Sequence, residues 1–356
     1  MKLSLWAAAA TCAATFGAGS FAVAEAPATG TVLVVTSHDA PLVREGAGYI
    51  AMYDPVSGAK RGQIDIDRIT PHELIVLKDG KRALAPVFGS GGVGTPGTDG
   101  DSIAVIDLVA RKVTGYIELG RKNRPHFGVL GEKDGLVYIT TELDDTVTVI
   151  DPQALKVTAI LPTGQPQSHN VAVSRDGKRA YTSNVYVGTV SVINIPKRKL
   201  EMVVPVAVGG KDPSGGPVNW AVQRIVVSND DRLVMTCDWK TSELVAIDTR
   251  SLEIVHRVKI PAPCYGMAAT HDGRFMLTAD YGADSVSVID MKSMKLLRSI
   301  PTPKKPQEIV ISPAGDMAFV TCVGTDEIAR IDMKNWTVDK VIAGGRWPDG
   351  IAWSPL

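Results

Sequence analysis

The sequence has little cysteine, few aromatic residues, no excess charge of either sign and no long apolar run beyond its N-terminus. Four of its 356 residues are cysteine, and 38 basic side chains balance 38 acidic ones. A net charge of zero gives no overall field that attracts nucleic acid, so we do not expect nucleic acid as a partner. With so few cysteines, a buried core and not a disulfide framework must hold the fold.

Motifs of the common enzyme classes are also missing. The sequence contains no GxSxG elbow, P-loop, CxxC pair or HExxH zinc motif. Each of these patterns places a nucleophile, a phosphate cradle or a metal for catalysis. The sequence therefore indicates no enzyme class, and a protein without catalytic activity is the favoured interpretation.

The N-terminus has the order of features of a secretory signal. Lys2 is followed by an apolar stretch from Leu3 to Ala14 and then by small residues that end at Ala24. This order predicts cleavage of residues 1–24 and a periplasmic or secreted mature protein. The apolar stretch is too short to span a bilayer, and no transmembrane segment is predicted elsewhere.

One phrase of alternating β-branched residues returns seven times along the chain. It ends in Asp or Asn, at Asp54, Asp107, Asp151, Asn194, Asp248, Asp290 and Asp332, at intervals of 53, 44, 43, 54, 42 and 42 residues. A unit of this length with four short strands separated by turns is typical of a propeller blade. Because the acidic residue recurs once per unit, we expect it to bond turn amides and not to act as an acid or base.

The two termini are expected to share one blade. The mature chain begins with a strand at 32–36 that lacks an inner neighbour, and it ends with one unpaired inner strand at 350–353. Their pairing closes the ring and removes two exposed sheet edges. The sequence therefore predicts an all-β fold, a seven-bladed β-propeller of four-stranded antiparallel blades, in which residues 25–356 form one domain and one monomer.

The repeat also carries a family resemblance. The strand end Tyr181-Thr182-Ser183-Asn184, followed by the strand from Thr189 to Asn194, resembles the YVTN-type repeat of the YncE-like propellers, and looser copies occur at 34–37 and 319–322. The resemblance implies the seven-bladed fold. It implies little about function, since proteins with this repeat include cell-surface and periplasmic binding modules of varied role.

Three long loops point to one face of the ring as the site. They span 38–48, 89–100 and 209–220, and all join strands at the face where the inner strands begin. Ligands of propellers bind most often at such loop-rich mouths.

Two columns of side chains at the start of the inner strands are expected to surround this mouth. The first column is His72, Phe127, His169, Gln223, Tyr265, Gln307 and Asp349. The second is Glu73, Asn170, Arg224 and Glu308, with glycine in the other three blades. His38 and His126 are expected near the same mouth. The ends of the second strands, Ser37, Val87, Glu142, Asn184, Asp238, Asp280 and Cys322, are expected to form the next ring outward.

Three functions fit these side chains. The favoured one is a binding or scaffolding module that takes a protein, peptide or small-molecule ligand at the mouth. The second is a metal-dependent, lactonase-like hydrolase with a cation near Glu73, Asn170, Glu308 and Asp349. The third is a redox-linked propeller in which an imidazole ligates haem or copper. The metal ligands expected are His72, His169 and Glu308, and the sequence leaves the cofactor open between a metal ion and haem.

Three cysteines remain after cleavage of the signal. Cys264 lies in a blade next to those of both Cys237 and Cys322, so it has two candidate partners for a disulfide. An odd number leaves at least one thiol unpaired. Only the geometry of the fold distinguishes the two pairings.

Overall fold

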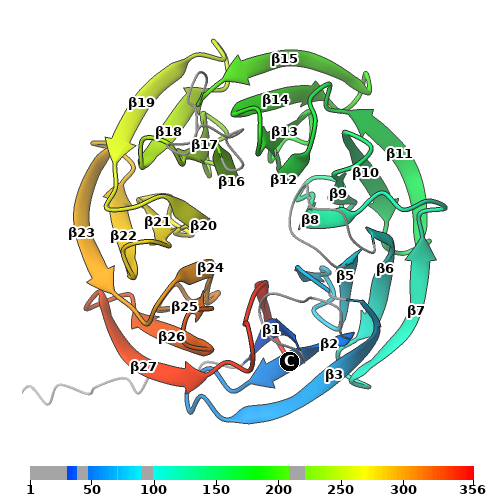
Figure 1. Cartoon of the computed structure of the whole chain (residues 1–356), viewed down its shortest axis with the longest axis vertical. Coiled ribbons are helices and arrows are strands. Elements are labelled where there is room, and N and C mark those ends of the chain that lie inside the picture. Colours follow the sequence, from blue (N-terminus) through cyan, green and yellow to red (C-terminus); the bar gives the residue numbers. More distant parts are fainter. Residues whose placement is uncertain (1–29, 38–46, 70, 90–98, 208–220) are drawn as a thin grey trace, which may run out of the picture.

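The chain folds into a ring of seven blades around a central channel (Figure 1). The computed structural model describes residues 30–37, 47–69, 71–89, 99–207 and 221–356. Each blade is a four-stranded sheet whose neighbouring strands run antiparallel. The predicted all-β, seven-bladed propeller is confirmed. The predicted signal peptide, His38 and most of the three predicted long loops lie outside the described residues.

Six blades consist of four consecutive strands, and the seventh joins the two ends of the chain. We number the closing blade 1 and the others 2 to 7 in chain order, with the inner strand first. Blade 1 has β28 (Ile351–Ser354), β1 (Thr31–Ser37), β2 (Ala47–Tyr53) and β3 (Lys60–Ile69). Blade 2 has β4 (Ile75–Val76), β5 (Arg82–Gly89), β6 (Asp99–Asp107) and β7 (Lys112–Glu118). Blade 3 has β8 (Pro125–Leu130), β9 (Val137–Thr141), β10 (Thr146–Asp151) and β11 (Lys156–Pro162). Blade 4 has β12 (Ser168–Val173), β13 (Arg179–Asn184), β14 (Thr189–Asn194) and β15 (Lys199–Pro205). Blade 5 has β16 (Val222–Val227), β17 (Leu233–Asp238), β18 (Glu243–Asp248) and β19 (Ile254–Lys259). Blade 6 has β20 (Cys264–Ala269), β21 (Phe275–Asp280), β22 (Ser285–Asp290) and β23 (Lys295–Pro301). Blade 7 has β24 (Pro306–Ile311), β25 (Met317–Cys322), β26 (Glu327–Asp332) and β27 (Thr337–Ala343).

The closing blade forms as the sequence predicts. The C-terminal strand β28 pairs antiparallel with β1, so that Leu33 lies opposite Ala352 and Val32 opposite Trp353. Leu33 and Ala352 belong to the same buried core cluster. The chain ends are therefore joined by a sheet and a shared core, and the inner edge of β1 is paired.

The alternating phrase explains how the blades stack. Successive residues of a strand face opposite sides of its sheet. Val147 and Val149 of β10 pack with Ala180 and Ile193 of blade 4, whereas Ile150 packs with blade 2. Each repeat thus has one apolar side for the blade before it and one for the blade after it. The buried β-branched residues of the phrase form the core between the blades.

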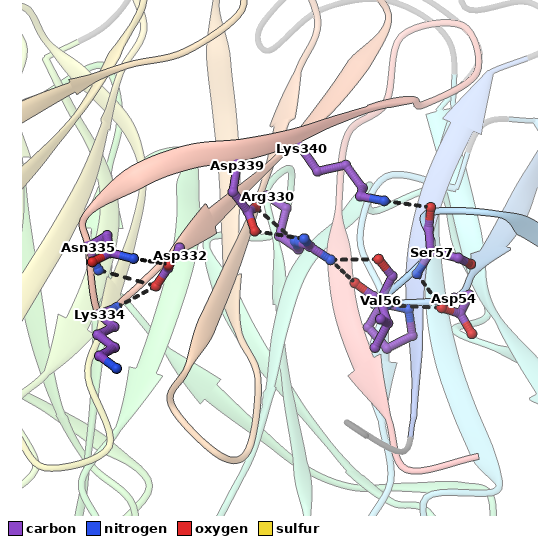
Figure 2. Close-up of polar contacts among 10 residues, drawn as sticks. Asp54, Val56, Ser57, Arg330, Asp332, Lys334, Asn335, Asp339 and Lys340 are labelled. Atoms are coloured by element: carbon purple, nitrogen blue, oxygen red, sulfur yellow. Dashed lines mark hydrogen bonds and ion pairs between the residues drawn. The ribbon is translucent and has the colours of Figure 1, made fainter. Parts of the chain in front are cut away.

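The repeated acidic residues make turns. Asp54 accepts hydrogen bonds from the backbone amides of Val56 and Ser57, and Asp332 accepts them from Lys334 and Asn335 (Figure 2). The same pattern recurs at Asp107, Asp151 and Asp248. The turn role predicted for these residues is confirmed.

A second link joins blades 7 and 1 at these turns. Arg330 of β26 donates to the carbonyl oxygens of Pro55 and Val56 at 2.9 and 2.7 Å, and Lys340 of β27 donates to that of Ser57 at 3.0 Å (Figure 2). The pairing of β1 with β28 is therefore not the sole contact that closes the ring.

Buried polar side chains at the ends of two second strands bond to hydroxyl groups of their own blades. In blade 4, the amide of Asn184 donates to Thr189 and Ser191, both at 2.9 Å. In blade 6, the carboxylate of Asp280 accepts from Thr278 and Ser287 at 2.7 and 2.5 Å. Burial raises the pKa of Asp280 to about 7. One structural position thus holds an amide in one blade and, in another, a carboxylate whose charged form is disfavoured by burial.

We expect Asp280→Asn to stabilise the protein at pH 8. The folded-state pKa of Asp280 lies above its ordinary value of 3.8, so its stabilising contribution is complete below about pH 4 and is lost as the pH rises through 7. Asparagine does not ionise, so the variant does not lose this contribution as the pH rises. We expect its free energy of unfolding to exceed that of the wild type by more than ~1 kcal/mol at pH 8 and by less at pH 5. Urea unfolding at both pH values measures it. Asp290→Asn is the control, because turn hydrogen bonds lower the pKa of Asp290, so this variant should lose stability at pH 8. Equal effects of Asp280→Asn at both pH values would contradict the prediction.

Among the described residues, none lies in an apolar helix long enough to cross a membrane.

Candidate binding site at the channel mouth

A β-bulge at the start of the inner strand recurs in five blades. The register between the first and second strands shifts at Pro125/Gly128, Ser168/Asn170, Val222/Ile225, Cys264/Met267 and Pro306/Ile309. A bulge inserts one extra residue and redirects the side chains there. In blades 5, 6 and 7 both predicted columns lie within the bulge, and in blade 4 His169 does. In blade 3 the bulge contains His126 and Phe127, so His126, and not Phe127 as predicted, takes the first-column position, and Phe127 takes the second. The fold therefore interrupts regular pairing at the positions where the polar columns occur.

Three histidines and a phenylalanine pack together on one side of the mouth. His126 stacks on His169 with ring centroids 3.8 Å apart, and His72 lies 4.3 Å from His126. Phe88 packs edge-on against His72 and His126, with centroids 5.3 and 5.1 Å away. The exposed fractions of His72, His126 and His169 are 7%, 1% and 2%. The structure thus gathers imidazoles from blades 2, 3 and 4 into one buried cluster.

Hydrogen bonds orient the two stacked imidazoles. Nδ1 of His126 lies 2.9 Å from the carbonyl oxygen of His169, and Nδ1 of His169 lies 2.5 Å from Oε1 of Glu142. Because a carbonyl oxygen only accepts, Nδ1 of His126 carries the proton and its Nε2 carries the lone pair. Burial, together with His169 and His72, lowers the pKa of His126 well below 6.5 and keeps the ring neutral. His126 therefore offers a buried lone pair at Nε2.

The other side of the ring is bridged by amide and carboxylate groups. Gln307 donates from Nε2 to Asp349, and Nδ1 of His72 lies 3.4 Å from Oδ2 of the same carboxylate. Gln223 is 1% exposed. The column residues Phe127 and Tyr265 are half-buried. Blades 7, 1 and 2 are thus linked side chain to side chain across the mouth.

An ion-pair cluster forms the second column. The guanidinium of Arg224 pairs with Glu308 and lies 3.6 Å from Glu73, and it stacks over the ring of Phe127 at 4.0 Å. Burial raises the pKa of Glu73 to about 7, although Arg224 opposes the shift. Gly266 leaves room for this arrangement, since a Cβ there would lie 3.1 Å from Oε2 of Glu308 and 2.3 Å from the carbonyl oxygen of Gln307. Arg224 supplies the positive charge that a cation was expected to supply.

A cavity of about 320 Å³ borders the Arg224 cluster within the channel. Its lining includes Glu73, Arg224 and Glu308 together with apolar residues of the inner strands, and it reaches Glu132 and Arg175 in the turns after β8 and β12. The charged cluster therefore faces a space lined by both polar and apolar surface.

The predicted metal ligands are divided between these two clusters. His169 pairs with Glu142, and His72 lies beside Asp349, whereas Glu308 pairs with Arg224. Asn170, expected near a cation, is buried on β12. Glu142 was expected only in the ring of second-strand ends. Among those strand ends it is the only glutamate, and its side chain is longer than those of the aspartates and the asparagine. This extra length is the feature of the sequence that indicates contact with the neighbouring blade.

A disulfide joins Cys237 of β17 to Cys264 of β20, with Cα atoms 5.9 Å apart, and Cys322 is free and buried. Of the two pairings left open by the sequence, this is the one that links blades 5 and 6. Nε1 of Trp239 donates to the carbonyl oxygen of Cys264 at 2.8 Å, and its ring packs against Tyr265 with centroids 5.5 Å apart. The disulfide thus holds the aromatic side of the mouth.

The comparisons with known proteins agree with the fold. The model of the YncE-like β-propeller family matches residues 225–354, which run from blade 5 to the closing strand. Among solved structures, the chain is similar to hydrazine synthase of Kuenenia stuttgartiensis, with a TM-score of 0.67 and 15% identity over 89% of this chain and 99% of that chain. It is also similar to the periplasmic gluconolactonase PpgL of Pseudomonas aeruginosa, with a TM-score of 0.70 and 16% identity over 91% and 99%. At these identities the likeness shows the fold alone. No curated protein matches the chain. The family match and the closed seven-bladed ring together confirm the predicted resemblance to the YncE-like β-propellers.

Proposed function

We propose that this protein is an exported binding module that captures a small hydroxylated molecule at the mouth of its channel. One observation carries the proposal. Nε2 of His126, Oε2 of Glu142 and Nε2 of Gln223 are buried and have no hydrogen-bond partner among the residues that the structure describes. A buried polar atom without a partner costs ~1–3 kcal/mol. Three such atoms from blades 3 and 5 mark a place where a ligand recovers that cost.

The chemistry of these atoms favours a ligand with several hydroxyl groups. Nε2 of His126 and Oε2 of Glu142 accept hydrogen bonds, whereas Nε2 of Gln223 donates one. A hydroxyl group both donates and accepts, so the hydroxyl groups of a polyol suit both kinds of atom. The half-buried ring of Tyr265 adds a flat apolar surface to the same mouth. A sugar or sugar acid combines these properties.

The signal-like N-terminus and the disulfide support export to the periplasm or the medium. Disulfides persist in oxidising compartments, and Cys237–Cys264 bridges two blades. The pairing of β28 with β1 covers the edge of β1 that a second copy would otherwise pair with, which favours a monomer.

A second candidate function is hydrolysis of a sugar lactone. The 2.5 Å contact between Glu142 and Nδ1 of His169 resembles the carboxylate and imidazole pairs that act as general bases. The solved structure of similar fold from Pseudomonas aeruginosa is named a gluconolactonase. Binding without turnover and binding with turnover are therefore the two outcomes to separate.

We expect the mature protein to bind gluconate in a saturable manner in isothermal titration calorimetry. We expect Gln223→Leu to weaken this binding about tenfold, since the lost hydrogen bond contributes ~1 kcal/mol or more. Gln153→Leu, in the exposed turn after β10, is the control and should bind like the wild type.

The same protein is then incubated with glucono-1,5-lactone, and loss of the lactone is followed by NMR. No loss beyond the uncatalysed rate supports the binding module, and accelerated loss supports the hydrolase. If neither the acid nor the lactone binds, the proposed ligand class is wrong.

A further inference from the structure

We infer that His126, His169 and Glu142 bind a divalent transition-metal ion of the zinc type at the channel mouth. The inference rests on the proposed binding function and names the component of the site that binds first. One imidazole nitrogen or carboxylate oxygen from each of the three residues lies within 4.8 Å of the other two. All three side chains are buried.

The spacing suits closure around one ion. A tetrahedral zinc ion with bonds of about 2.1 Å holds its ligand atoms about 3.4 Å apart. Nδ1 of His169 and Oε1 of Glu142 are 2.5 Å apart and separate slightly when an ion replaces the proton between them. Nε2 of His126 then approaches from the stacked ring. The three ligand atoms lie within 4.8 Å of one another, and any wider separation among them shortens to about 3.4 Å.

The surrounding hydrogen bonds resemble those that orient metal ligands. Histidine ligands commonly donate their second N–H to a carbonyl or carboxylate oxygen, which fixes the nitrogen that faces the metal. Nδ1 of His126 does this toward the carbonyl oxygen of His169. Oγ1 of Thr140 donates to the same oxygen at 2.7 Å and holds it in place. The lone pair at Nε2 is thus aimed by the backbone of the neighbouring blade.

Charge also favours a cation at this cluster. The Glu142 side chain is 1% exposed, and its Oε2 has no hydrogen-bond partner within the described part of the chain. A buried carboxylate needs a compensating positive charge. The Arg224 cluster already contains such a charge between Glu73 and Glu308, whereas no arginine or lysine is paired with Glu142 among the described residues. The same reasoning places an ion beside Glu142 and none beside Glu308.

The ligand types select the ion. Two imidazoles and one carboxylate suit zinc, cobalt, nickel or copper, whereas calcium and magnesium prefer oxygen ligands. Three protein ligands leave at least one position open, as in sites that bind a substrate or water and unlike closed structural sites. With the ion bound, Nε2 of His126 and the carboxylate of Glu142 contact the metal, and a hydroxyl group of the ligand proposed above takes the open position instead of bonding to these two residues directly.

The test is a titration of the mature protein, prepared without a histidine tag and treated with a chelator. Cobalt(II) is added and followed by visible absorption, and zinc and calcium are added separately in a calorimeter. We expect one cobalt or zinc ion per chain and no calcium binding. We expect Glu142→Gln and His126→Ala to weaken zinc binding at least 100-fold. His256→Ala, on the exposed face of β19, is the matched control and should bind like the wild type.

Circular dichroism of each metal-free variant shows whether it folds. If a variant does not fold, the titration of the wild type alone tests the metal site. Absence of stoichiometric cobalt or zinc binding by the wild type overturns the inference. Unchanged zinc affinity in folded Glu142→Gln overturns it as well. If gluconate binds the metal-free protein and no metal binds, the metal site is wrong and the binding function stands. If neither binds, both are wrong.

Discussion

A chain that ends at Asp349 is expected to lose most of the stability of the ring. Removing Gly350 to Leu356 deletes β28 and leaves the inner edge of β1 unpaired. It also removes Ala352 from the core that includes Leu33, and Trp353 from its contact with Phe319. Losing the buried Ala352 together with the half-buried Ile351 and Trp353 costs ~4 kcal/mol or more. For a domain of this size we expect a melting temperature lower by roughly 10 °C or more.

Differential scanning calorimetry of the two chains measures this effect. The control is a chain that lacks only Pro355 and Leu356, which follow β28 and are exposed. The turn contacts of Arg330 and Lys340 persist in both chains and are partly exposed hydrogen bonds. If the longer truncation melts like the full chain, those contacts close the ring by themselves and the pairing of β28 is dispensable.

Arg224→Leu is expected to destabilise the protein by ~3–5 kcal/mol. The substitution leaves Glu73 and Glu308 buried without their shared guanidinium, and breaking a buried pair in this way is costly. It also removes the contact with the ring of Phe127. Urea unfolding at pH 7 measures the loss. Arg175→Leu is the matched control, because Arg175 pairs with Glu132 in exposed turns and such pairs contribute ~0–1 kcal/mol.

Two further measurements distinguish lost charge from lost packing. Burial already raises the pKa of Glu73, and loss of the opposing Arg224 raises it further, so the deficit of the variant should shrink at pH 5, where Glu73 is protonated. Adding Glu308→Leu should restore at least half of the lost stability, because it removes one of the two buried carboxylates that Arg224→Leu leaves without a partner. A deficit that is equal at both pH values and is not relieved by the second substitution would show that Arg224 acts through packing alone.

The fold was predictable because each blade repeats the same local sequence pattern. The phrase that ends at Asp54 or Asp332 sets a strand, a turn and two packing faces, and six of the seven sheets need nothing more. The closing blade followed from counting strands at the two ends. The disulfide did not, since Cys264 lies in a blade next to two candidate partners and only the Cα separation of 5.9 Å distinguishes Cys237.

The composition of the mouth was predictable, but its pairings were not. The polar columns follow from aligning the starts of the inner strands, and the bulges there explain why they differ from the apolar positions that follow. Which side chains meet depends on their length and on the stagger between blades. Arg224 reaches Glu308 two blades away, and Glu142 reaches His169 in the next blade. The repeat does not encode such contacts, because they vary from blade to blade.

These pairings give the two clusters different chemistry. Arg224 pairs with Glu308 and lies beside Glu73, whereas in the cluster of His126, His169 and Glu142 the atoms Nε2 of His126 and Oε2 of Glu142 have no hydrogen-bond partner within the described residues. We therefore propose Glu142 as the carboxylate ligand of a metal ion, in place of Glu308, which the sequence predicts for this role.

The most direct measurement is an anomalous difference map from a crystal of the mature protein soaked in zinc and recorded at the zinc absorption edge. We expect one peak between Nε2 of His126, Nδ1 of His169 and the carboxylate of Glu142, with bonds of about 2.1 Å. No peak at this position, or a peak only at an exposed residue such as His256, would contradict it.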